Sequence, residues 1–149
     1  MAAAAKHIRQ QIREAVVTKL KEITTFSNRI YPYRTMPHTL LPDAVVKTDE
    51  DVVIGEQTAD HKYMRALALT IEARAKATSD IDDTMDSLCL AIEEKMMAAP
   101  TFGGLLKKLD LSSTKIEMSQ EGDQPVGLAT LEYEAWYRML RSDADTVVN

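Results

Sequence analysis

Apolar residues recur every three or four positions from His7 to Thr24, and polar or charged residues fill the places between them. This spacing places the apolar side chains along one side of an α-helix. Each large aliphatic side chain contributes roughly 1.5 to 3 kcal/mol when buried, so the helix becomes stable once it docks on a sheet or another helix. The apolar side consists of Ile8, Ile12, Ala15, Val16, Leu20 and Ile23.

A loop is expected from Phe26 to Leu41, because prolines within and just after this segment interrupt regular backbone hydrogen bonding. Beyond the loop, the apolar runs 44–47 and 52–54 flank a short acidic stretch. We predict two short strands or one hairpin here, with the acidic stretch as the turn. That stretch consists of Asp49, Glu50 and Asp51.

A strand is predicted from Tyr63 to Lys76, although several residues of this segment favour helices. Leu67, Leu69 and Ile71 alternate with other residues, as on a strand with one buried face. A helix would separate Leu67 and Leu69 by about 200° around its axis. We therefore expect packing in a sheet to override the helical propensity.

A second helix is predicted after Ser79 or Asp80, either of which can cap it. Asp82 and Asp83 would lie in its first turn, where the helix dipole favours negative charge, and Pro100 follows its end. Its apolar side consists of Ile81, Met85, Leu88, Cys89, Ile92 and Met96.

The last third of the chain predicts two strands joined by a turn over 121–125. In the first strand, Leu105, Leu109 and Leu111 alternate, and Ile116 and Met118 continue the alternation in the other phase. A change of phase indicates a bulge or break, which we expect near residues 112 and 113. The second strand is long, from Val126 to Leu140, and its core face consists of Ala129, Leu131, Tyr133, Ala135, Tyr137 and Met139.

The other face of this long strand mixes apolar, aromatic and charged side chains. It is too apolar to be fully exposed to solvent and too charged to be fully buried in the core. It is a candidate interface between copies of the chain, with Trp136 at its centre. Two interpretations stay open for Trp136, because the proline-rich loop of the same chain could cover it instead. The interface candidates are Leu128, Glu134, Trp136, Arg138 and Leu140.

Helices and strands in this order predict an α+β fold, a mostly antiparallel sheet with two amphipathic helices packed on one face. At 149 residues the chain is long enough for one core and too short for two. We expect a single domain over 1–141 and a flexible tail over 142–149.

The net charge of -5 is the wrong sign for a protein that binds tightly to phosphates or anionic lipid. No stretch approaches the roughly 20 apolar residues that span a bilayer, and the start of the chain does not look like a signal peptide. The single cysteine fits a reducing compartment. We expect synthesis in the cytoplasm and no association with membranes.

The residues that could carry chemistry fit structural roles better than catalytic ones. His7, His38 and His61 lack the spacing of a zinc site, and the neighbours Asp60 and His61 fit an exposed loop better than an acid-base pair. Cys89 falls in the apolar side of the second helix, where a core residue is the simpler interpretation.

Two further motifs are incomplete. The acidic residues from Asp80 to Asp86 imitate the start of a calcium loop, but Met85 replaces its glycine and Ala91 its final glutamate. Gly103 and Gly104 lack the Lys-Ser or Lys-Thr of a phosphate loop. We therefore expect no catalytic residue, metal or cofactor.

The sequence resembles the bacteriophage tail terminator family, also described as minor tail protein U-like or tail completion proteins, over about residues 7 to 140. None of the similar segments is a catalytic signature. They are His7-Ile8-Arg9, Arg29-Ile30-Tyr31-Pro32, Leu41-Pro42-Asp43-Ala44-Val45-Val46, Arg65 to Ala75, the helix beginning at Asp80, Thr101-Phe102-Gly103-Gly104-Leu105, Pro125-Val126-Gly127-Leu128-Ala129, and Tyr133 with Tyr137-Arg138.

This resemblance implies a virion protein that forms a homohexameric ring at the head-proximal end of the tail tube. Such a ring stops polymerisation of the tube protein and presents a docking surface to the neck of the filled head. DNA passes through its lumen without specific binding. Asp49, Glu50 and Asp51 are expected to face the lumen, where like charge repels DNA.

Other functions stay open at this point. Within structural proteins, the alternative is another component of the head-tail neck. From a different class, the same α+β arrangement could serve a small ligand-binding module or an enzyme.

Overall fold

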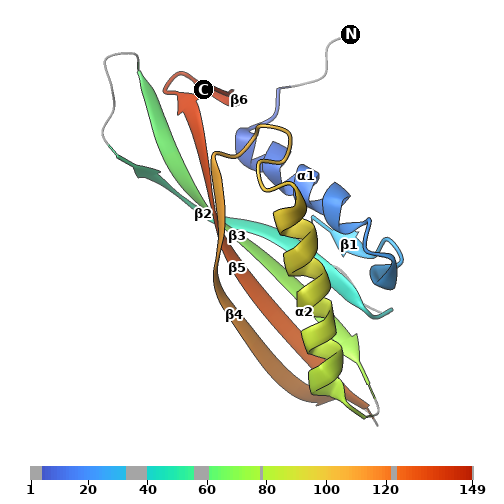
Figure 1. Ribbon diagram of the computed structural model, residues 1–149. Coiled ribbons are helices and arrows are strands. Elements are labelled where there is room, and N and C mark those ends of the chain that lie inside the picture. Colours follow the sequence, from blue (N-terminus) through green and yellow to red (C-terminus); the bar gives the residue numbers. More distant parts are fainter. Residues whose placement is uncertain (1–4, 33–39, 56–60, 78, 122–123, 149) are drawn as a thin grey trace.

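The computed structural model describes residues 5–32, 40–55, 61–77, 79–121 and 124–148. In this part of the chain, two α-helices and one short 3-10 helix accompany six strands (Figure 1). The elements in order are α1 (Ile8–Leu20), the 3-10 helix η1 (Thr24–Phe26), β1 (Ile30–Tyr31), β2 (Asp43–Ile54), β3 (Lys62–Lys76), α2 (Ile81–Ala98), β4 (Lys108–Glu121), β5 (Gln124–Leu140) and β6 (Asp143–Val147).

The strands form one sheet in the order β1-β2-β3-β5-β4, and β6 also pairs with β5. Only the short pairing of β1 with β2 is parallel, and every other described pair is antiparallel. The prediction of an α+β protein with a mostly antiparallel sheet is therefore confirmed. β4 forms one edge of the sheet, as Figure 1 shows.

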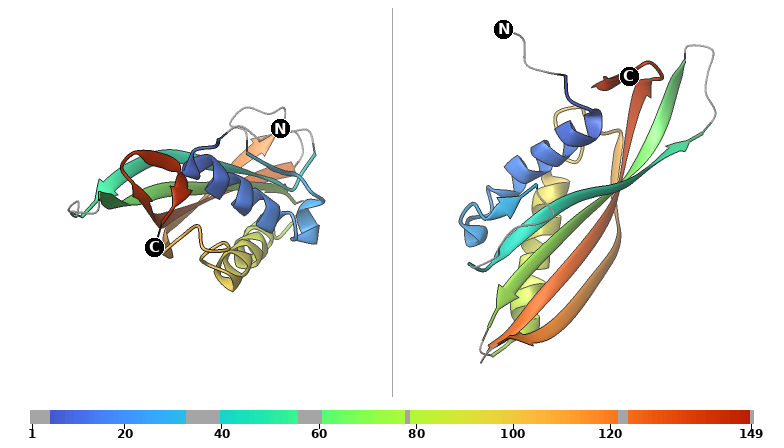
Figure 2. Two further views of the ribbon diagram at one scale, coloured as in Figure 1. Left: turned by 90° about the horizontal axis from the view of Figure 1, so that it is seen from above. Right: turned by 180° about the vertical axis from the view of Figure 1, so that it is seen from behind.

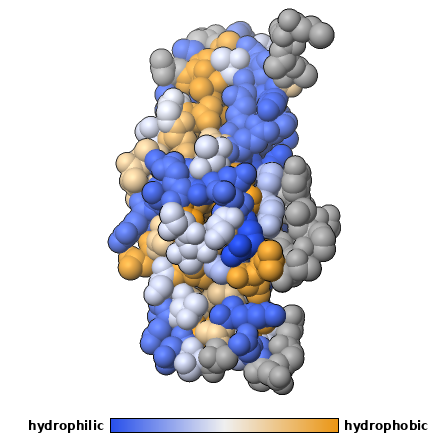
Figure 3. All heavy atoms as spheres, turned by 90° about the vertical axis from the view of Figure 1, so that its right-hand side faces the viewer, coloured by the Kyte–Doolittle hydropathy of each residue, from blue (hydrophilic) through white to orange (hydrophobic). Residues whose placement is uncertain are grey.

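The core lies between the sheet and the helices, and its side chains have the period predicted for each element. All six predicted core residues of β5 are buried, and so are Leu67, Leu69 and Ile71 of β3. These side chains belong to one apolar cluster with the buried residues of α1 and α2. The two helices contact each other, α2 contacts β3 and β5, and α1 contacts β1, β2 and β6 (Figure 2). On the side seen in Figure 3, hydrophobic surface patches lie between hydrophilic ones.

α2 begins and ends close to its predicted positions, whereas α1 ends at Leu20, four residues before the predicted end at Thr24, and Ile23 lies outside the helix with an extended backbone. Asp80 does occupy the cap position of α2, but its side chain makes no capping hydrogen bond. In α1 the cap is His7, whose Nδ1 accepts a hydrogen bond from the backbone N–H of Arg9 at 3.0 Å. A histidine cap was not predicted, because histidine is not among the common capping residues.

β2 corrects the prediction of two short strands around an acidic turn. It is one continuous strand, and its pairing with β3 shifts by one residue between Thr48 and Glu50. Asp49 is the extra residue of this bulge. Consecutive acidic residues are typical of a turn, which is why a turn was predicted. A bulge in a paired strand also accommodates such residues.

The C-terminal segment also differs from the expectation. Residues 143–147 form β6 in place of the expected tail, and the Gln11 side chain of α1 donates a hydrogen bond to the Asp145 carbonyl at 2.7 Å. In β4, by contrast, the predicted bulge is confirmed, since the pairing with β5 shifts between Leu111 and Ser113. The segment around the predicted loop contains η1 and β1, and residues 33–39 lie outside the described part.

Gly127 sets how closely α2 approaches β5. A Cβ atom at this position would lie 2.6 Å from Sδ and 2.7 Å from Cγ of Met85, which is fully buried. We expect Gly127→Ala to lower the free energy of unfolding by about 1 to 3 kcal/mol, because the added methyl group would overpack the core against Met85. Chemical denaturation measures this loss.

The matched test is a double-mutant cycle with Met85→Ala. That substitution alone should lower stability by roughly 2 to 5 kcal/mol through the cavity it leaves. The double variant should be more stable than the sum of the two losses predicts, because the alanine at 127 then meets empty space. Additive losses would mean that Gly127 does not contact Met85.

Candidate functional site

The face of the sheet opposite the core is the first candidate surface, and we call it the outer face. It carries the even-numbered side chains of β3 and β5 together with Glu50 and Val52 of β2. All five interface candidates of β5 lie on it. Glu134 is exposed, and Leu128, Trp136, Arg138 and Leu140 are half-buried. Their role in an interface stays a prediction.

A shallow groove of about 550 Å³ crosses the outer face. The small side chains Ala66, Ala68 and Thr70 of β3 line it, and larger residues of β2 and β5 stand on both sides. The groove forms because a strand with small side chains lies between two strands with larger ones.

Carboxylates surround this groove. The register places Glu50, Ala68 and Glu134 side by side in one row across three strands, and Glu132 lies on the same face. Glu132 accepts a hydrogen bond from the Ser113 hydroxyl at 3.0 Å. Among the described residues, no cation forms an ion pair with Glu50, Glu132 or Glu134. The centre of the outer face is therefore negatively charged.

Trp136 lies at the border of this negative region. Its indole N–H donates to Oε1 of Glu134 at 2.6 Å, and Nζ of Lys108 lies 4.4 Å from the centre of its ring. Lys108 faces Trp136 from the edge strand β4. Residues 33–39, which include Pro37 of the proline-rich loop, are outside the described part of the chain, so both interpretations of Trp136 stay open.

The three residues of the acidic stretch do not share a surface. Asp49 and Glu50 are exposed, whereas the Asp51 side chain is only 6% exposed and points to the core side of the sheet. The bulge at Asp49 causes this separation, because it makes Glu50 and Asp51 face opposite sides at this point of the strand. The predicted lumen position stays a prediction for Asp49 and Glu50, but Asp51 has a different environment.

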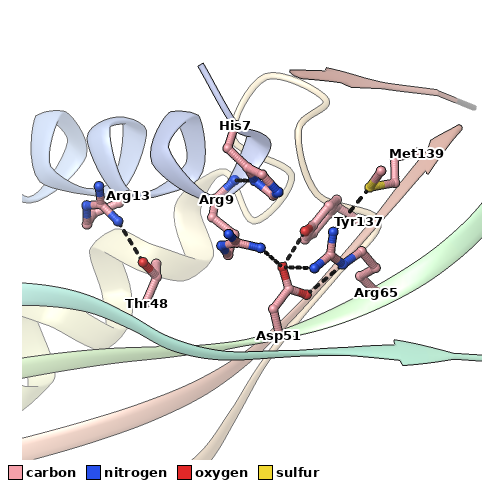
Figure 4. Close-up of polar contacts among 8 residues, drawn as sticks. All are labelled: His7, Arg9, Arg13, Thr48, Asp51, Arg65, Tyr137 and Met139. Carbon is pink, nitrogen blue, oxygen red and sulfur yellow. Dashed lines mark hydrogen bonds and ion pairs between the residues drawn. The ribbon is translucent and has the colours of Figure 1, made fainter. Parts of the chain in front are cut away.

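Asp51 is the centre of a cluster that joins four elements (Figure 4). Its carboxylate accepts hydrogen bonds from Nη1 of Arg9 in α1 at 3.0 Å and from Nε of Arg65 in β3 at 3.1 Å. Nη2 of Arg65 also lies 3.1 Å from the carboxylate, and the Tyr137 hydroxyl of β5 donates to it. The guanidinium of Arg65 lies over the Tyr137 ring at 5.8 Å.

The electrostatics of this cluster follow from burial. Burial, then the hydrogen bond to Asp51, raises the pKa of the Tyr137 hydroxyl well above its usual range, so this group remains a donor. Burial and the positive charges of Arg9 and Arg65 lower the pKa of His7. A neutral His7 can accept the capping hydrogen bond of α1. Both carboxylate oxygens of Asp51 accept hydrogen bonds from these side chains. The cluster therefore has a structural role, because it holds α1, β2, β3 and β5 together.

The other residues considered for chemistry lie apart from one another. Cys89 is buried in the core, where burial raises the pKa of its thiol. Nδ1 of His61 lies 3.1 Å from Nη2 of Arg141, while His38 and Asp60 lie outside the described residues. In the described ranges no group of three His, Cys, Asp or Glu side chains is arranged to hold a metal ion. No helix there is long and apolar enough to cross a membrane.

No protein-family model matches this sequence, and no curated protein matches it either. The resemblance to tail terminators therefore stays a prediction.

We expect Asp51→Ala to lower the free energy of unfolding by about 3 kcal/mol, because it leaves Arg65 buried without its carboxylate. For a chain of this size, the loss corresponds to a fall in Tm on the order of 10 °C, which calorimetry measures.

The control is Glu50→Ala, which removes the same kind of charge one residue away on the exposed face. It should change stability by less than about 0.5 kcal/mol. Equal effects of the two substitutions would contradict the role of Asp51 as the centre of the cluster.

Proposed function

We propose that this protein is a structural component of a phage virion, a tail terminator that forms a homohexameric ring at the head-proximal end of the tail tube. One observation carries the proposal. Every described residue of β4 from 110 to 119 is exposed, on both faces of the strand, although β4 pairs along its length with the largely buried β5. A long exposed edge strand is a surface on which other chains can add.

In this proposal, both helices pack on one face of the sheet and form the outside of the ring. The acidic part of the outer face, with Asp49, Glu50, Glu132 and Glu134, lines the channel, and Trp136 at the border of this part contacts the next copy. Carboxylates there repel the phosphates of DNA, so DNA passes without sticking. The negative charge of the groove and the net charge of -5 both support this assignment.

The ring acts by shape. One of its two ends matches the last ring of tube protein, and the other end lacks the surface that would accept a further ring. Growth of the tube then stops without any covalent step, and the free end receives the neck protein of the filled head. Another position in the head-tail neck is the alternative within the same class.

A small ligand-binding module is the second candidate, and the groove over Ala66 and Ala68 favours it. Its volume of about 550 Å³ is within the range of small-molecule sites. The two candidates differ in oligomeric state. A ligand-binding module needs no partner copy, whereas a terminator acts only as a ring.

The purified protein is expected to form a single ring species, measured by size-exclusion chromatography with light scattering over a concentration series. Electron microscopy should then show rings with an open channel. A protein that remains monomeric at the highest concentration and copurifies with a metabolite would support the ligand-binding module and overturn the proposal.

Trp136→Ala should weaken assembly by about 2 kcal/mol per contact if Trp136 anchors an interface, which is roughly a thirtyfold change in the dissociation constant. Trp136→Phe, which keeps an aromatic ring under Lys108, is the matched control and should retain most of the assembly. Unchanged assembly of Trp136→Ala with a lower Tm would assign Trp136 to packing within one chain.

A further inference from the structure

Most of the large exposed hydrophobic side chains of the described residues lie beside the edge strand β4. They are Leu111, Ile116 and Met118 of β4 with Leu90 and Met97 of α2. The others in the described ranges, in or just before β2, are Leu40, Val52 and Val53. An apolar surface beside a free strand edge indicates contact with another chain.

The core side of β4 is exposed because α2 lies over the neighbouring strands β3 and β5. Ile116 and Met118 pair with Ala129 and Gly127 of the core face of β5, yet they are 38 and 42% exposed. No described strand pairs with the other edge of β4. Free backbone groups and uncovered apolar side chains therefore occur along the same strand.

The side of α2 that faces β4 belongs to the same surface. α1 contacts β1 and β2, so the side of α2 away from α1 faces β4 (Figure 1). Lys95 marks the α1 side of α2, since its Nζ lies 3.7 Å from Oε1 of Glu22. Leu90 and Met97 lie about 140 to 160° from Lys95 around the helix axis, on the β4 side.

The middle of β4 is complementary to itself. Lys115 and Glu117 lie on the outer side of the strand, and Ile116 between them lies on the core side. In an antiparallel pair of two β4 strands centred on Ile116, Lys115 of each copy lies opposite Glu117 of the other. Ile116 meets its own counterpart on the core side, and Ser113 lies opposite Ser119. Charge complementarity and apolar contact therefore occur in the same register.

Neighbouring registers lack this complementarity. Residues directly opposite each other in a sheet point to the same face, so the centre of such a pair must lie on a residue. A centre at Lys115 would place two lysines opposite each other, and a centre at Glu117 would place two glutamates there. Like charges directly opposite destabilise a strand pair, so the charges favour the centre at Ile116.

We propose that β4 pairs with β4 of a second copy of this chain around a two-fold axis at Ile116, so that the two sheets join into one. The contact is isologous, because the same surface of both copies forms it. The helices of both copies remain on one face of the joined sheet. Leu90 and Met97 of each α2 then border the apolar side of the joint.

This inference goes beyond the proposed ring and does not depend on it. Neighbours within a ring are related by the ring axis, so a two-fold contact is a separate one. Where rings form, the β4 pairs join two rings face to face, and where none form, they join two single chains. In either form the pair covers the long edge strand of the free protein, which protects it from aggregation.

Ile116→Lys tests the centre of the pair, because it places two lysines opposite each other on the apolar side. Light scattering should find that this substitution halves the particle mass, from a double ring to a single ring or from a dimer to a monomer. Position 116 is on the surface, so the Tm should stay within a few degrees of that of the unmodified protein. Thr18→Lys, at an exposed position on α1, is the control and should leave the mass unchanged.

Charge reversal tests the register. Lys115→Glu and Glu117→Lys each make both charged pairs of the joint like-charged, so the dissociation constant of each variant alone should rise about tenfold. In an equimolar mixture, two negative side chains of one variant face two positive side chains of the other. Analytical ultracentrifugation at low ionic strength should then find the mixture as tightly paired as the unmodified protein.

The remaining outcomes separate this inference from the proposed ring. A ring whose mass Ile116→Lys leaves unchanged would overturn the inference, and the terminator proposal would stand. Pairing of the charge variants that does not recover in the mixture would overturn the register and with it the inference. A dimer that Ile116→Lys converts to a monomer, without rings, would support the inference and overturn the terminator proposal. An unmodified chain that remains monomeric would overturn both.

Discussion

One buried carboxylate ties the first helix to the sheet. Asp51 binds Arg9 of α1, Arg65 of β3 and Tyr137 of β5, so it joins the start of the first helix to three strands. A buried charge is costly unless its partners are in place, and removal of any partner leaves the others without compensation. The bulge at Asp49 makes this possible, because it turns Asp51 toward the core side and Glu50 toward the outer face.

The local patterns of the sequence predicted the elements well where one period runs without interruption. Both helices, β3 and β5 follow from their spacing, and the change of phase around Ser112 predicted the bulge in β4. The continuity of β2 and the strand β6 were missed, because each depends on a partner strand far away in the sequence. A pattern of polar residues does not reveal such a partner.

The candidate surfaces were predictable only in part. The alternation along β5 placed Trp136 and Glu134 on the face away from the core, which the register of the sheet confirms. The role of Asp51 was not predictable, since 42 residues separate Asp51 from Arg9 and 86 separate it from Tyr137. The negative groove likewise requires Glu50 and Glu134 to lie in one row, and only the pairing of β2, β3 and β5 brings them together.

The bulge in β4 has a consequence for how this strand tolerates changes in length. Ser112 is the additional residue, and its hydroxyl donates to the Glu132 carbonyl at 2.9 Å. Loss of this single residue would restore a regular ladder and rotate the strand beyond it by half a turn. Ile116 and Met118 would then project among the carboxylates, and Lys115 and Glu117 would project beside α2. The number of residues in β4 therefore determines which side of this strand is hydrophobic and which side is charged.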